Sequence, residues 1–144
     1  MTDVRIATGL LIAGIAAAVI GCAPAPAGPP ATPSETLAPL VQEALPNVPG
    51  KTFTSATVTF PPGARAVPHR HGDAFVYAYV LEGAVRSQVE GGPTRTYGQG
   101  ENWTEQPGAH HVATENVSPT APAKLLVVFV STTGAELKVD DPHR

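Results

Sequence analysis

Residues 63–83 read GARAVPHRHGDAFVYAYVLEG, and this stretch decides the fold. Within it, small apolar residues alternate with aromatic ones over residues 74–81, a period of two that predicts a strand ending at Gly83. His69 and His71 lie two positions apart just before it. On an extended chain both imidazoles therefore point to one face and can meet one ion.

The same strand pattern extends on both sides of this stretch. β-branched residues alternate over residues 51–60, and LLVVFV at residues 125–130 predicts a central strand covered on both faces. One short helix is expected after Ser34, where apolar residues recur at helical spacing until Pro46. Further strands are expected at residues 84–89, 94–97, 102–105, 111–114 and 124–131. Short strands between Gly and Pro turns predict an all-β sandwich or barrel.

A second histidine cluster lies in residues 100–115, which read GENWTEQPGAHHVATE. His110 and His111 are adjacent, so on a strand they point to opposite faces and only one can join His69 and His71. Neutral imidazole is the commonest metal ligand. The alternative is that these histidines lie on a polar surface. Three imidazoles would suit one divalent ion of Fe, Mn, Ni, Cu or Zn.

Both stretches resemble the two motifs of the cupin superfamily. The first pattern is Gly, five residues, His-x-His, a spacer, Glu, six residues and Gly, and the second contains Pro-x-Gly followed by His. With flanking strands the resemblance covers residues 51–131. It implies a double-stranded β-helix, or jelly-roll barrel. It also implies one metal ion inside the barrel, held by His69, His71 and His111.

The chain departs from these motifs at three positions. Val76 stands where the first motif has its glutamate, and valine cannot bind a metal ion. Gln106 replaces the first proline of the second motif. Glu115 takes the position of its asparagine, with Asn116 one residue late. The family's ligand set of three histidines and one glutamate is therefore reduced to three histidines.

Glu105 is the candidate replacement acid, because it precedes His111 closely and shares a strand face with Trp103. A carboxylate inside an apolar barrel would need a metal ion or a hydrogen-bond donor. The alternative is that Glu105 lies on the outer face in water. Asp73 is a weaker candidate. The residues expected in a ligand pocket are Val76, Ala78, Trp103 and His110, although Trp103 could simply pack and His110 could lie on the surface.

The N-terminal segment predicts export. Residues 6–20 are apolar and uncharged, which suits a signal peptide over residues 1–21. Residues 19–22 resemble a bacterial lipobox, in which Cys22 is lipidated. A Pro- and Ala-rich tether over residues 22–34 and a cupin domain over residues 35–144 follow. The expected location is the cell envelope, on a membrane through the lipid anchor; a cleaved signal without lipid, or an uncleaved anchor, is the alternative.

Composition narrows the function classes. A net charge of −3 argues against nucleic-acid binding, and one cysteine excludes an internal disulfide. The sequence shows no Ser-His-Asp grouping. It favours a metal-dependent enzyme of dioxygenase, isomerase or lyase type acting on a small molecule, with oxygenase-like chemistry first. A non-catalytic binding cupin and a structural lipoprotein remain alternatives. Tyr77 and Tyr79 suit a homodimer interface or packing against the expected helix.

Overall fold

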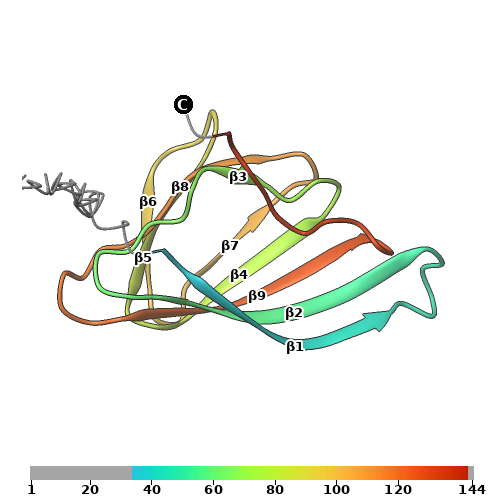
Figure 1. Ribbon diagram of the computed structural model, residues 1–144, viewed down its shortest axis with the longest axis horizontal. Helices are drawn as coiled ribbons and strands as arrows, with labels where there is room; N and C mark the ends of the chain where they lie inside the picture. The colour runs from blue at the N-terminus through green and yellow to red at the C-terminus, as the bar shows by residue number, and fades with distance from the viewer. Residues whose placement is uncertain (1–33, 143–144) are drawn as a thin grey trace, which may run out of the picture. The chain divides into compact units, whose positions relative to one another are not determined.

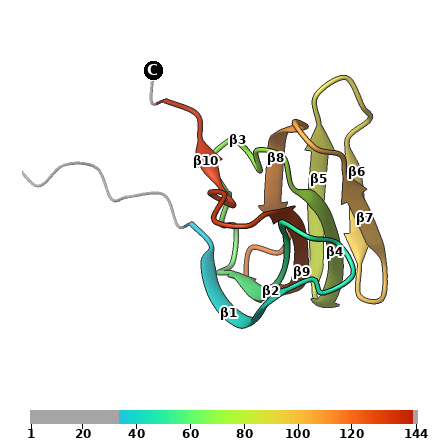
Figure 2. The same ribbon diagram turned by 90° about the vertical axis from the view of Figure 1, so that its right-hand side faces the viewer.

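The computed structural model describes residues 34–142, which form ten strands in two five-stranded sheets (Figure 1). The first sheet has the order β1-β2-β9-β4-β7 and the second β10-β3-β8-β5-β6. The strands are β1 (Thr36–Ala44), β2 (Lys51–Phe60), β3 (His69–Arg70), β4 (Phe75–Glu82), β5 (Ala84–Val89), β6 (Arg95–Gly98), β7 (Asn102–Glu105), β8 (His110–Asn116), β9 (Ala123–Thr132) and β10 (Val139–Asp140). The paired strands run antiparallel, and the two sheets face each other (Figure 2). The expected all-β jelly roll is confirmed.

The core lies between the sheets. Strand β9 is central in its sheet, as predicted, and its inward residues Leu125, Val127 and Phe129 are buried. Its outer face is only half-buried, so the prediction that both faces are covered was too strong. Tyr77 and Tyr79 lie half-buried on the outer face of β4, and the homodimer expected through them stays a prediction.

The segment expected to be a short helix is strand β1. It pairs antiparallel with β2, and all nine of its residues are exposed. Its apolar residues match helical spacing, but Pro39 lies among them and would remove a helical hydrogen bond. At the edge of a sheet proline is tolerated, and the register of β1 shifts between Pro39 and Val41. The prediction of a helix was therefore wrong, and this segment with its proline forms an edge strand instead.

The chain crosses between the two sheets several times, and glycines lie at the crossings from β4 to β5 and from β7 to β8. Gly83 joins β4 to β5 with φ of 73°, and a Cβ there would lie 2.9 Å from the carbonyl oxygen of Pro122. Gly108, with φ of 80°, joins β7 to β8, and its N–H donates to the carbonyl of Gly72. Both values of φ favour glycine. These crossings set the inward face of β4 and β7 opposite the histidines of β3 and β8.

Two short strands were not predicted. β3 and β10 have two residues each, too few to show a period in the sequence. They pair with each other, with Val139 opposite Arg70 and Asp140 opposite His69 (Figure 2). The C-terminal part of the chain therefore lies along β3, which carries His69 and directly precedes His71.

The N-terminal predictions lie outside the described residues 34–142. They are the signal peptide, the lipidation site Cys22 and nearly all of the tether. Within residues 34–142, we find no helix with the length and apolar character needed to cross a membrane.

Candidate metal centre

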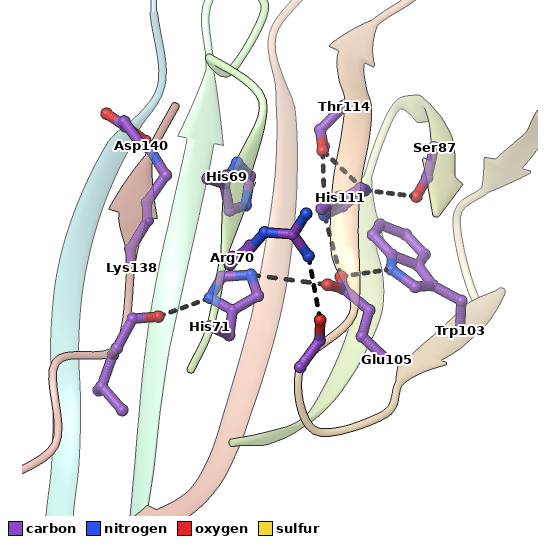
Figure 3. Close-up of polar contacts among 12 residues, drawn as sticks. His69, Arg70, His71, Ser87, Trp103, Glu105, His111, Thr114, Lys138 and Asp140 are labelled. Atoms are coloured by element: carbon purple, nitrogen blue, oxygen red, sulfur yellow. Dashed lines mark hydrogen bonds and ion pairs between the residues drawn. The ribbon is translucent and has the colours of Figure 1, made fainter. Parts of the chain in front are cut away.

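Three buried histidines meet between the sheets. His69 lies on β3 directly opposite His111 of β8, and His71 follows β3 (Figure 3). Their candidate ligand atoms lie within 4.8 Å of one another. The ring centroid of His69 is 4.7 Å from that of His71 and 5.1 Å from that of His111. The structure thus brings together the three histidines of the two motifs.

Backbone carbonyls fix the tautomers of two of these rings. His69 Nδ1 lies 2.6 Å from the carbonyl oxygen of Val67, and His71 Nδ1 lies 2.5 Å from that of Leu137. Because a carbonyl only accepts, Nδ1 carries the proton in both rings. Burial lowers the pKa of His69 to about 4 and also lowers the pKa of His71. Near neutral pH both rings therefore present an Nε2 lone pair.

The acid that completes the cluster comes from the neighbouring strand. Glu105 of β7 pairs with Val76 of β4, the position of the missing motif glutamate. Its side chain is 3% exposed, which excludes the alternative that it lies in water. Its Oε1 accepts a hydrogen bond from Trp103 Nε1 at 3.1 Å and lies 3.0 Å from His111 Nδ1. The acid thus lies one strand away from its place in the family motif.

The second carboxylate oxygen of Glu105 has no hydrogen-bond partner. Oε2 is buried and lies 3.6 Å from His71 Nε2. Burial acts to raise the pKa of Glu105, but its hydrogen bond and charge interaction with His111 help to hold the pKa below the ordinary value. An ionised oxygen and an imidazole lone pair therefore face each other without a proton between them. This arrangement fits a cation.

Hydroxyl groups hold the third histidine. His111 Nε2 lies 2.8 Å from Ser87 Oγ and 2.8 Å from Thr114 Oγ1 (Figure 3). With Nδ1 donating to Glu105, both ring nitrogens are engaged. An ion bound to His111 must therefore replace one of these hydrogen bonds. Sequence reasoning missed Ser87 and Thr114, because their position beside His111 depends on how β5 pairs with β8.

The cluster lies at the wall of a cavity of about 290 Å³. Apart from the cluster and Thr114, its polar lining is the ion pair between Glu35 and Lys138, at 2.9 Å. The predicted pocket residues Val76 and Ala78 line this cavity. The other apolar lining residues are Leu37, Val58, Phe60, Ala66, Leu125, Val127, Phe129 and Leu137. The cavity suits a small, largely apolar molecule.

Two predicted pocket residues do not line this cavity. Trp103 packs its ring 4.8 Å from that of Tyr97 and contacts the site through its hydrogen bond to Glu105 and an edge contact with the His111 ring. His110 points to the other face of β8, as expected for one of two adjacent residues. Its Nε2 lies 2.9 Å from the Asp141 carboxylate.

The departures at the end of the second motif have structural roles. Glu115 forms ion pairs with Arg65 and Arg86. The buried amide of Asn116 donates to three backbone carbonyls, at the end of β2 and in the adjoining loops. Asp73, the weaker acid candidate, is exposed and pairs with Lys51. None of these residues lines the cavity.

Solved structures share this fold. An uncharacterised double-stranded β-helix protein from Klebsiella pneumoniae matches with a TM-score of 0.59 and 16% identity, covering 79% of this chain and 90% of its own. The TT1209 protein from Thermus thermophilus matches with a TM-score of 0.55 and 26% identity, covering 67% of this chain and 82% of its own. The DMSP lyase DddQ from Ruegeria pomeroyi matches at 0.53 and 25%, covering 60% of this chain. This chain spans 42% of that lyase.

The family is decided by the sequence match. No curated protein matches the chain. The cupin domain family matches residues 56–129, a stretch that holds all three histidines and Glu105. Because this stretch is more than half of the 144 residues, the chain belongs to the cupin domain family.

Proposed function

We propose that this protein is a metal-dependent cupin enzyme that acts on a small molecule. One divalent transition metal ion would be held by His69, His71, His111 and Glu105. The observation that carries the proposal is the convergence of unshared electron pairs on two imidazoles and one buried carboxylate oxygen. When bound, such an ion supplies Lewis-acid chemistry at open coordination positions.

The chain's own residues would bind and orient the substrate. The apolar walls of the cavity exclude water and hold an apolar body against the cluster. Thr114 adds one hydroxyl beside it. The likeness to a DMSP lyase supports lyase-type chemistry within the expected range of dioxygenase, isomerase and lyase. The substrate class we propose is therefore a small molecule with an apolar body and one metal-binding group.

One observation favours a non-catalytic binding cupin as second candidate. Apart from the four proposed ligands, the titratable groups that line the cavity are Glu35 and Lys138, and these pair with each other. No carboxylate or amine on the cavity wall is thus left free of an ion pair to act as a base. Turnover that requires both metal and His71 would favour the enzyme.

Metal content tests the proposal. The protein is purified from its native host and analysed for metals, beside the variants His71→Ala and Arg70→Ala. We expect about one metal ion per chain in the parent and in Arg70→Ala, whose side chain reaches the carbonyl of Gly108 instead of the cluster. His71→Ala should lose the ion, because it removes a free Nε2. A parent protein without metal would overturn the site.

We also propose that the protein is an envelope lipoprotein anchored through Cys22. Support comes from the sequence, where the one cysteine of the chain follows a lipobox-like segment. Radioactive palmitate should label the parent and not Cys22→Ala. Equal labelling of the two would reject the anchor.

A further inference from the structure

The C-terminal segment, residues 135–142, lies along β3, which carries His69 and directly precedes His71. Its β10 residues pair with β3, and the N–H of Asp141 donates to the carbonyl of Pro68 at 2.8 Å. One carbonyl of this segment, that of Leu137, accepts the Nδ1 proton of His71. The orientation of a proposed metal ligand thus depends on a short segment outside the main strands.

His71 lies between two acceptors and can satisfy only one. The Leu137 oxygen is 2.5 Å from Nδ1, and Glu105 Oε2 is 3.6 Å from Nε2. A neutral imidazole carries a single N–H. Here the proton is on Nδ1, so the Nε2 lone pair faces Oε2, which is buried without a partner.

We propose that the C-terminal segment holds His71 in its metal-binding tautomer, and that the site closes when the segment leaves. Without the Leu137 acceptor, Nδ1 gives its proton to water and Nε2 takes one up. The new Nε2–H then donates to Glu105 Oε2. That internal hydrogen bond satisfies the carboxylate and removes the lone pair that a metal ion needs. This inference rests on the proposed function and adds a means of regulating it.

The contacts of the segment suit a part that can separate from the barrel. Lys138 pairs with Glu35 at 2.9 Å and with Asp140 at 2.5 Å, and Asp141 pairs with His110 at 2.9 Å. Most of these charged groups are partly exposed, so their pairing is weak in water. β10 has two residues, whereas β2 and β9 pair over ten. The barrel can therefore persist after the segment detaches.

Truncation tests the proposal. One variant ends at Gly134 and lacks the segment, and a control ends at Pro142 and keeps it. The tautomer of His71 is read in metal-free protein from imidazole ¹⁵N chemical shifts, and Co²⁺ affinity is measured separately. We expect Nδ1–H in the parent and control, and Nε2–H in the variant ending at Gly134. Its Co²⁺ affinity should fall about 10- to 100-fold, the usual effect of losing a group that orients a ligand.

A full-length variant keeps the test decisive if the truncated chain does not fold. Lys138→Glu reverses both ion pairs of Lys138 and should shift His71 toward Nε2–H. The proposal would be overturned if both variants retain Nδ1–H and bind Co²⁺ with an affinity within about twofold of the parent. If the truncated chain is unfolded, the same result in Lys138→Glu alone would overturn it. If the parent binds no Co²⁺, the proposed metal function fails, while the tautomer still decides the role of the segment.

Discussion

Asp73 and Glu105 both have a pKa below the ordinary value, yet their surroundings are opposite. Asp73 is exposed, and hydrogen bonds from Lys51 and Thr132 lower its pKa to about 2. Glu105 is buried beside His111, and one of its oxygens has no partner. Asp73 has donors for both oxygens, as expected of a surface tie between loops. The Oε2 atom of Glu105 has no hydrogen-bond donor, which is typical of a carboxylate in a binding site.

The two carboxylates also differ in what their surroundings contribute to the stability of the fold. An exposed ion pair such as that of Asp73 contributes little to stability, because solvent screens it. A buried polar atom without a partner costs about 1–3 kcal/mol, and more when charged. The proposed metal binding at Glu105 would offset this cost. Substitutions of Glu105, of Asp73 and of residues beside Glu105 test this difference.

The largest effect is expected from removing the buried acid. Glu105→Gln keeps the shape of the side chain but removes the charge that faces His71. We expect Co²⁺ affinity to fall at least about 100-fold, because a ligand is lost and not merely reoriented. Asp73→Asn is the matched control and should leave the affinity unchanged. Equal affinities in both variants would remove Glu105 from the site.

Moving the acid by one strand should restore the site. Val76 and Glu105 are paired across β4 and β7, so the double variant Val76→Glu with Glu105→Val returns the acid to the motif position. We expect its Co²⁺ affinity to recover to within about 10-fold of the parent, because a charge that faces the same cavity is again present. The single variant Glu105→Val serves as reference. Failure to recover would show that the place of the acid, and not only its charge, is essential.

A smaller effect is expected from the donor that orients the acid. Trp103→Phe removes the N–H that binds Glu105 Oε1 and keeps an aromatic ring. We expect Co²⁺ affinity to fall about 10-fold, as for other groups that orient a ligand. Tyr97→Phe, which keeps the ring packed on Trp103, is the control. An unchanged affinity in Trp103→Phe would mean that His111 alone fixes the acid.

The smallest effect concerns Asp73 and pH. Because the folded-state pKa is lowered from 3.8 to about 2, its contribution to stability is fully present well above pH 4 and is lost as the pH falls through 2. We expect the parent to have a slightly higher urea midpoint than Asp73→Asn at pH 6, and most of this difference to be lost by pH 2. A difference at pH 2 as large as that at pH 6 would contradict the assignment of the low pKa to Asp73.

The sequence predicted most strands of four or more residues, but not the two-residue strands β3 and β10. Residues of β2 alternate in type over ten positions, and β9 contains a continuous apolar run, so each carries a recognisable strand signal. β1 was misread because its apolar spacing suits a helix, and only pairing with β2 made it a strand. β3 and β10 owe their hydrogen bonds to each other and to β8, which no local pattern encodes.

The site was predictable where a motif specifies side chains. His69, His71 and His111 follow from motif spacing, whereas the inward orientation of Glu105 depends on which face of β7 meets the core. The sequence offered two equal alternatives for that face. The Leu137 carbonyl carried no signal, because every residue has one. The hydroxyl of Ser87 is similar, since it reaches His111 only through the register of two strands.

The position of Trp103 has an optical consequence. It is the only tryptophan among 144 residues, and its ring lies between Tyr97 and the proposed metal ligands. Its centroid is 6.2 Å from that of His111. Tryptophan fluorescence, excited in the near ultraviolet, therefore reports on a single site in the molecule. Paramagnetic ions such as Cu²⁺ or Ni²⁺ bound at the cluster would quench its emission, so the protein carries an intrinsic fluorophore beside its own cavity.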